Sequence, residues 1–332
     1  MNKNIKRIAK TALIFLLPVA AMYVVMEILS MITCGSHIIS SMLDLNLFLK
    51  NAGINICLGL AMALNMGAGR MDMSLGAQRL IACIIGGNIA MSLGLGPIPT
   101  LLVCVFFGAL SGAIVGVVFV KTKVAPMILT LGMMLIYECV VFKLYPEGVH
   151  IYGNENFALL SNTTFIVVAT IIVVAVLVFL LNYSEFGYNY KATSVAIQVA
   201  ERSGVNVKKN IILTFAIAGV LIGMAGIFEA SYIGTVESTL SMGSMEKVFL
   251  AFTPVLIGRI LAMYSDTVLG TVSAVLMLRV LSQGLTVMKV ESNTCSVINT
   301  AVLLAGFAIM TYLSQNKTKK AIALRKAEAE GT

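Results

Sequence analysis

The sequence predicts an all-α membrane protein with about ten spans, and composition and hydropathy pattern support this fold class. Hydrophobic residues make up 59% of the 332 residues and charged residues only 11%, whereas a soluble domain carries roughly a quarter charged residues. Apolar runs of about 20 residues recur along the chain, and each can cross roughly 30 Å of hydrocarbon. We therefore interpret residues 1–332 as a single transmembrane domain.

The apolar runs are separated by short polar segments, which place the expected spans. The first run follows a basic segment, 1–10, and is too long for a signal peptide, so we expect a retained helix. Ahead of the second run, residues 38–49 are expected to form a separate interfacial or partial helix interrupted by Asp44 and Asn46. The expected spans are residues 11–30, 52–66, 74–93, 98–120, 124–142, 164–182, 211–229, 245–262, 266–283 and 297–314.

The distribution of basic residues predicts the orientation in the membrane. Lys and Arg accumulate in the segment 1–10, in the alternate loops and in the tail 315–332, and they exceed those of the opposite loops roughly four to one. The basic residues of the alternate loops are Arg70, Lys121, Lys123, Lys191, Arg202, Lys208, Lys209 and Arg259. We therefore expect both termini to be cytoplasmic. The formal net charge of +8 does not indicate nucleic-acid binding, because these residues flank spans instead of clustering on a soluble face.

The sequence contains no pattern typical of a cofactor site or an enzyme. The six cysteines show no CxxC spacing, and the two histidines, His37 and His150, both fall in predicted outer loops. No GxxxxGK[ST] phosphate loop occurs, so the chain itself is not expected to hydrolyse ATP. No cluster of catalytic residue types falls at one membrane depth, and we expect neither a cofactor nor enzymatic activity.

The stretch from 65 to 78, NMGAGRMDMSLGAQ, places polar residues between two apolar helices. One interpretation is a helix break beside a transport pathway or gate, since polar groups at membrane depth occur where protein or a wet cavity surrounds them. The alternative is a plain cytoplasmic turn, in which Ser74 caps the next helix. The candidate residues are Gly69, Arg70, Asp72, Ser74 and Gly76.

Small residues in two spans follow a spacing that lets helices pack closely. They are Gly108, Ser111, Gly112 and Gly116 in one span and Gly219, Gly223 and Gly226 in the other. Ionisable residues inside spans each need a partner or water, and a contact between Arg79 and Glu138 is one option. The ionisable residues are Glu27, Arg79, Glu138, Glu229 and Arg279.

The long inner loop, 183–210, is expected to have a function of its own. Its middle, 192–201, reads ATSVAIQVAE and is expected to form one short helix with Val195, Ala196 and Val199 on an apolar face. Gly204 is expected to end that helix. A partner protein or the lipid headgroups can cover such a face, and both interpretations stay open.

Three stretches resemble the permease subunits of bacterial ATP-binding cassette importers for ribose, xylose, galactose and related solutes. GRMDMSLG, residues 69–76, is similar to the family's Gly-Gly-Ile-Asp-Leu-Ser-Val-Gly, with Arg70 in place of a glycine. KTKVAPMILTL, residues 121–131, resembles the entry to the next helix. Residues 200–229 resemble the family's cytoplasmic loop and the glycine-rich helix after it, and the whole likeness runs from about 53 to 312.

The resemblance implies the transmembrane permease subunit of an importer for a sugar or similar small polar solute in the bacterial inner membrane. It implies three partners: a cytoplasmic ATP-binding subunit, an extracytoplasmic solute-binding protein, and a second permease copy or a homologous permease. The loop 183–210 would then contact the ATP-binding subunit. Its candidate contact residues are Val195, Val199, Glu201, Ser203, Gly204 and Val205.

One turn departs from the family pattern. IGRILAMYSDTVLG, residues 257–270, keeps Gly258 but lacks most glycines of a Gly-Gly-Thr-Ser-Leu-x-Gly-Gly-Lys-Gly-like turn, so Gly258 is the candidate for a second, altered helix break. Gly258-Arg259 also echoes Gly69-Arg70, which makes an internal repeat one of two balanced interpretations.

Two other kinds of transporter remain open. Permeases for nucleosides or branched-chain amino acids share the architecture. An ion-coupled secondary transporter is the other alternative, and it would need Glu27, Glu138 or Glu229 for its coupling ion.

Overall fold

The computed structural model describes residues 3–122, 124–151, 157–262 and 266–291 and parts of 294–312, with residues 3–14 described by their backbone alone. Almost all of this part of the chain is helical, and its only strands are β1 (Val149–His150) and β2 (Thr235–Val236), an antiparallel pair. Eight of the described helical segments are long and apolar enough to cross a membrane. The all-α polytopic fold is therefore confirmed, while the number of spans and the side of the termini remain predictions.

Nine of the expected spans coincide with helices, and residues 74–93 correspond to three consecutive helical segments with a π-helical centre. The span expected at 297–314 falls largely outside the described residues, and the tail 315–332 entirely so. The helices are α1 (Lys3–Cys34), α2 (Met42–Gly67), α3 (Leu75–Leu80), η1 (Ile81–Ile85), α4 (Gly86–Ser92), α5 (Pro97–Thr122), α6 (Pro126–Leu144), α7 (Thr163–Tyr183), α8 (Glu185–Val195), α9 (Ile197–Arg202), α10 (Val207–Ile233), α11 (Met245–Leu261) and α12 (Thr267–Val287).

The separate partial helix expected at 38–49 is wrong, because α2 runs without interruption from Met42 to Gly67. Asp44, interpreted from the sequence as an interruption, belongs to a capping box at the start of this helix. The Ser41 hydroxyl accepts a hydrogen bond from the Asp44 amide at 3.2 Å, and the Asp44 carboxylate accepts one from the Ser41 amide at 2.9 Å. The polar residue therefore begins the helix instead of breaking it.

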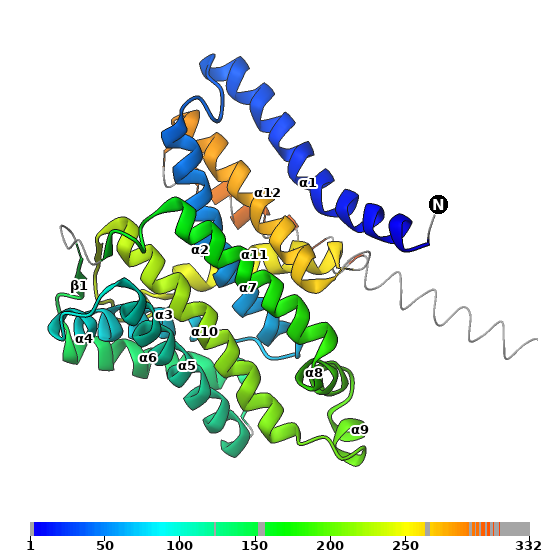
Figure 1. The fold of residues 1–332 in the computed structure, drawn as a ribbon, viewed down its shortest axis with the longest axis vertical. Coiled ribbons are helices and arrows are strands. Elements are labelled where there is room, and N and C mark those ends of the chain that lie inside the picture. The colour runs from blue at the N-terminus through cyan, green and yellow to red at the C-terminus, as the bar shows by residue number, and fades with distance from the viewer. Residues whose placement is uncertain are drawn as a thin grey trace, which may run out of the picture.

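Figure 1 shows β1 and α4 at one end of the molecule and α8 and α9 at the opposite end, with α7 and α10 running between them. Three long helices, α2, α10 and α12, are the most buried: 67% of the apolar window of each is buried, against 11% in α1 and 22% in α7. Polar groups on α2 and α10 therefore face protein more than lipid.

The small-residue spacing has the packing role that the sequence predicts, because α5 and α10 lie backbone to backbone. A Cβ atom placed on Gly108 would lie 2.4 Å from the carbonyl oxygen of Gly219, so no larger residue fits there. Gly112 of α5 and Gly223 of α10 have similarly close backbone neighbours on the facing helix. We call this contact the α5–α10 seam.

Candidate functional site

Residues 68–74 form a largely buried, non-helical connection between α2 and α3, which we call the break segment. Gly69, its second residue, has a φ of +73°, a conformation that glycine adopts without steric cost. Arg70, Asp72 and Ser74 are only 3%, 0% and 0% exposed. The plain-turn interpretation requires Ser74 to cap α3, but its side chain makes no capping hydrogen bond to that helix.

Asp72 is the polar centre of the break segment. One of its carboxylate oxygens accepts hydrogen bonds from the Ser74 hydroxyl at 2.6 Å and from the Ser74 amide at 2.9 Å. The other oxygen accepts from Asn65 on α2 and from Gln78 on α3, both at 3.1 Å. A single buried carboxylate thus holds the end of one helix to the start of the next.

Neighbouring elements hold the break segment from two sides. The Met73 amide donates a hydrogen bond to the Thr130 hydroxyl of α6 at 3.0 Å. Gly76 lies so close to the loop before α11 that a Cβ atom there would be 2.1 Å from the carbonyl oxygen of Ser244. The motif glycine at 76 is therefore required for close approach and not for a turn.

The charged residues inside the spans pair differently from the contact considered in the sequence. Arg79 forms an ion pair with Glu229 at 2.9 Å, and Lys247 binds the other oxygen of the same carboxylate at 2.7 Å. Glu138 accepts hydrogen bonds from the amide and the hydroxyl of Ser244 at 2.9 and 2.6 Å. The contact between Arg79 and Glu138 is therefore wrong, because each is engaged by another element.

The pairing of Arg79 with Glu229 shows where the break segment lies along α10. Arg79 lies in the last turn of the short helix α3, and its partner Glu229 is near the far end of α10, which is long enough to cross a membrane. Leu64, at the end of α2 and before the break segment, contacts the loop 183–210, which lies at the opposite end of α10. Residues 68–74 therefore carry the chain part of the way along α10 as irregular, largely buried backbone.

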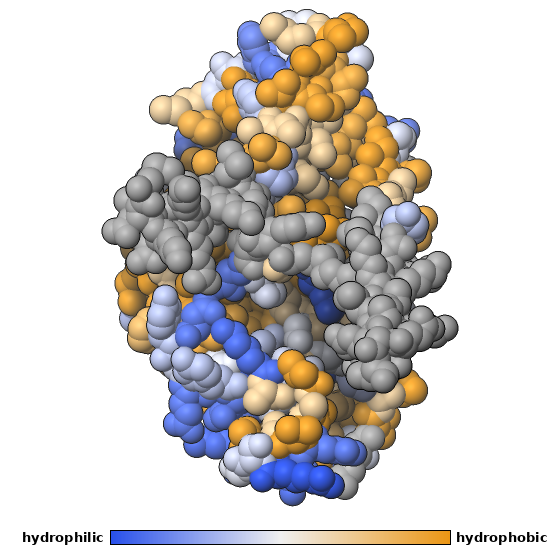
Figure 2. Space-filling view, turned by 90° about the vertical axis from the view of Figure 1, so that its right-hand side faces the viewer, coloured by the Kyte–Doolittle hydropathy of each residue, from blue (hydrophilic) through white to orange (hydrophobic). Residues whose placement is uncertain are grey.

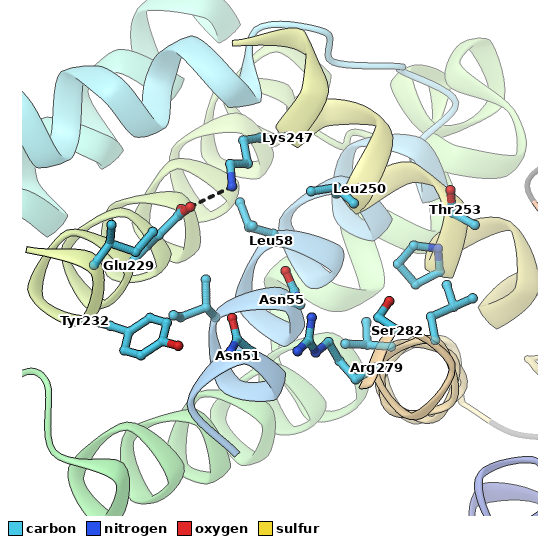
Figure 3. A pocket seen from close by; sticks show the side chains of 15 residues that line it. Asn51, Asn55, Leu58, Glu229, Tyr232, Lys247, Leu250, Thr253, Arg279 and Ser282 are labelled. Carbon is cyan, nitrogen blue, oxygen red and sulfur yellow. Dashed lines mark ion pairs between the residues drawn. The ribbon is translucent and has the colours of Figure 1, made fainter. Parts of the chain in front are cut away.

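A cavity of about 200 Å³ lies among α2, α10, α11 and α12, and Figure 3 shows the side chains that surround it. Its polar lining residues are Asn51, Asn55, Glu229, Tyr232, Lys247, Thr253, Arg279 and Ser282. A few convergent polar groups in a partly apolar cavity are typical of a small-molecule site. Sequence analysis did not assign the neutral residues, although the i, i+4 spacing of Asn51 and Asn55 on one face of α2 was an available signal.

Gly258 lies inside α11 and not at a helix break. A Cβ atom on it would be 2.7 Å from the Cα atom of Thr271, so this glycine lets α11 pack closely on α12. Gly69, its counterpart in the suspected repeat, has a positive φ in an irregular segment. The two Gly-Arg pairs of the suspected internal repeat thus have different backbone conformations.

The loop 183–210 forms two helices in place of the single one expected at 192–201. Ala196 is extended, with φ of −153° and ψ of 99°, and separates α8 from α9. Gly204 follows α9 with a φ of +83°, as expected for a helix stop. Val195 and Val199 are 87% and 63% exposed, so their apolar side chains are uncovered. Glu201, Ser203 and Gly204 are exposed as well, and Val205 is half-buried.

Tyr190 of α8 connects this loop to the last turn of α2, directly before the break segment. Its buried hydroxyl donates a hydrogen bond to the Leu64 carbonyl oxygen at 2.8 Å, in the last turn of α2. Burial raises the pKa of Tyr190 to about 12, so the hydroxyl remains a donor at neutral pH.

Figure 2 views the end of the molecule that carries α8 and α9, where hydrophilic residues gather around a hollow in the lower half.

Comparison with known proteins places these features in a family. Residues 48–309 match the family described as "Branched-chain amino acid transport system / permease component". The chain belongs to this family. It is thus a multi-pass permease component of the inner membrane, in agreement with its eight candidate spans.

Curated relatives and a solved structure resemble this permease over most of its length. The galactose/methyl galactoside import permease protein MglC of Escherichia coli K12 is 26% identical, covering 86% of this chain and 91% of the relative. The autoinducer 2 import system permease protein LsrD of the same strain is 28% identical, covering 79% and 83%. A metal-chelate type ABC transporter in an inward-facing conformation shares the fold, with a TM-score of 0.55, 13% identity and coverage of 89% and 97%.

Proposed function

We propose that this permease is the membrane subunit of an ATP-driven importer for a sugar or similar small polar solute. The observation that carries the proposal is the polar cavity, where Asn51, Asn55, Thr253 and Ser282 offer both donors and acceptors for solute hydroxyl groups. The relatives named for import of galactose and of autoinducer 2 support an import function.

The family description names branched-chain amino acids, but the cavity fits such solutes less well. A zwitterionic amino acid needs a negative partner for its ammonium group. Glu229 is the carboxylate on the cavity wall, and Arg79 and Lys247 already bind its two oxygens. This arrangement favours a hydroxylated solute over an amino acid.

The energy for transport would enter through the loop 183–210. The sequence has no P-loop motif, so ATP hydrolysis requires a separate cytoplasmic ATP-binding subunit. The uncovered apolar side chains of Val195 and Val199 offer that subunit a surface, next to Glu201 and Gly204. Tyr190 would pass movement of α8 to the end of α2, and from there to the break segment.

Two further partners belong to this proposal. An extracytoplasmic solute-binding protein would deliver the solute at the end of the molecule that carries β1 and α4 (Figure 1). A second permease copy or a homologous permease would complete the assembly in the membrane. Both follow from the family resemblance, and the exposed apolar faces of α5 and α7 leave room for lipid or for such a neighbour.

An ion-coupled mechanism is disfavoured by the state of the three carboxylates that it would need. Glu27 contacts His37 at 2.5 Å and accepts a hydrogen bond from the Ile38 amide at 3.1 Å. Glu138 accepts a hydrogen bond from the Ser244 amide, and Glu229 forms an ion pair with Arg79. None of the three is left free for a coupling ion in the described part of the chain.

Reconstitution tests the proposed function. The permease in proteoliposomes should take up labelled solute only when the ATP-binding subunit and ATP are present. Solute counterflow by this chain alone would instead demonstrate an independent transporter and overturn the proposal. The same preparation without ATP serves as the control for leakage.

A further inference from the structure

The cavity carries more positive than negative charge. The charged residues on its wall are Glu229, Lys247 and Arg279. Glu229 is shared between Lys247 and Arg79, so one carboxylate faces two cations in that cluster. Arg279 adds a third cation, and no carboxylate of the described residues forms an ion pair with it.

Arg279 is placed to meet a solute. It comes from α12, and Figure 3 shows its guanidinium beside Asn55 and Asn51 of α2, directed into the open space of the cavity. Its Nε atom is buried without a hydrogen-bond partner. A cation within a membrane span is unfavourable unless a counter-charge or water satisfies it, so this side chain lacks a counter-charge that a ligand can supply.

The positive charge extends beside the cavity. Lys50 lies over the ring of Tyr232, a lining residue, with its amine 5.4 Å from the ring centroid. Cations around a low-dielectric cavity focus an electric field that concentrates negative solutes. The neutral residues Asn51, Asn55, Thr253 and Ser282 complete the wall with groups that bind hydroxyls.

We propose that this cavity selects a hydroxylated anion, that is, a small solute with several hydroxyl groups and one carboxylate or phosphate. Arg279 pairs with the anionic group, because the planar guanidinium donates two parallel hydrogen bonds to either group. The asparagines and hydroxyls of the wall bind the rest of the solute. This inference rests on the proposed function and narrows its solute class.

Binding to the full-length permease in lipid nanodiscs tests the inference. The probes are matched pairs, galactose with galacturonate and glucose with glucuronate, together with galactose 6-phosphate and inorganic phosphate. At least one hydroxylated anion should bind about tenfold more tightly than its neutral counterpart. The carboxylate and phosphate probes show which anionic group the site prefers.

Variants assign the preference to one residue. Arg279→Gln should remove the preference for the anion, while Arg279→Lys should retain part of it because the charge remains. Lys143→Gln removes an exposed cation at the end of α6, away from the cavity, and should leave the preference unchanged. If Arg279→Gln fails to fold, Arg279→Lys still tests the inference, because it keeps the charge and should show a reduced preference for the anion.

Several outcomes would overturn the inference. Neutral sugars that bind as tightly as every anion, a preference that survives in Arg279→Gln, or no binding of any probe would each do so. Inorganic phosphate binding as tightly as galactose 6-phosphate would show a plain anion site that ignores hydroxyls. The importer itself is judged separately, since ATP-dependent uptake of a neutral sugar would contradict this inference and leave the proposed function intact.

Discussion

The α5–α10 seam and the break segment both depend on glycine, yet glycine acts in opposite ways in the two regions. In the seam, Gly108 and Gly219 keep two continuous helices in backbone contact. In the break segment, Gly69 turns the chain out of a helix, and polar bonds to Asp72 hold the irregular backbone. The glycines spaced along α5 and α10 therefore mark close packing, whereas Gly69 marks an interruption.

The two regions also differ in what can rearrange. Close packing holds the seam together, so moving its two helices apart breaks all of its contacts at once. The break segment is held by directional hydrogen bonds that other polar groups or water can replace one at a time. We therefore expect the seam to serve as a fixed support, and the break segment, joined to α8 through Tyr190, to respond to the ATP-binding subunit.

The largest effect is expected in the seam. Gly108→Val places a branched side chain against the α10 backbone and should destabilise the fold by about 3 kcal/mol or more, so that little folded permease is recovered. Size-exclusion chromatography of the detergent-extracted protein measures this loss. Gly132→Val is the matched control, because a Cβ atom on Gly132 meets nothing within 4 Å. Equal recovery of the two variants would show that the seam is not close-packed.

A smaller effect is expected in the break segment. Asp72→Ala leaves the donors of Ser74, Asn65 and Gln78 without their acceptor, at about 1–3 kcal/mol for a buried unsatisfied group. Uptake should fall about tenfold while the protein stays in the membrane, and Asp72→Asn should lose less because its amide oxygen still accepts. Normal uptake by Asp72→Ala at normal abundance would reduce the segment to a connector.

The coupling loop should show an effect on assembly. Gly204→Pro forbids the positive φ that ends α9, and Glu201→Arg reverses an exposed charge beside it. Both variants should co-purify with about fivefold less ATP-binding subunit, a change of about 1 kcal/mol. Gly94→Pro is the control, since Gly94 also has a positive φ but lies between α4 and α5, at the other end of the molecule. Unchanged co-purification in both loop variants would favour a helix that lies on lipid.

Orientation can be tested with little effect on transport. A cysteine at Asn162, exposed at the start of α7, should react with an impermeant reagent from outside. A cysteine at Lys208, exposed at the start of α10, should react only after permeabilisation. Reaction at position 208 in intact cells would reverse the predicted topology.

Hydropathy and residue spacing predicted most of the helices and the small-residue faces of α5 and α10, because these features depend on residues close together in sequence. That these two faces pack against each other, and that residues 68–74 interrupt the helices, became clear only in the structure. The contact of Arg79 with Glu229 could not be predicted from the sequence, since it depends on how far residues 68–74 carry the chain along α10. The cavity likewise gathers residues from four separate helices. Gly258 was misleading because its role depends on Thr271 of the neighbouring helix.

The two wrong helix boundaries have different causes. Asp44 in an apolar stretch predicted an interruption, although a carboxylate at the third helical position stabilises a helix start. In the loop 183–210, the apolar spacing of Val195 and Val199 predicted one helix. Nothing in the residue type of Ala196 signals the extended backbone that separates α8 from α9.

The claim that energy passes from α8 to the break segment depends on one hydrogen bond, from the Tyr190 hydroxyl to the Leu64 carbonyl oxygen. Tyr190→Phe removes that bond and keeps the ring. The decisive measurement is the number of ATP molecules hydrolysed per solute molecule imported, in proteoliposomes that contain the ATP-binding subunit. We expect this ratio to rise at least about twofold in the variant, with unchanged co-purification of the subunit, because a hydrogen bond of this kind contributes about 1 kcal/mol. A ratio equal to that of the unmodified permease would contradict the proposed route.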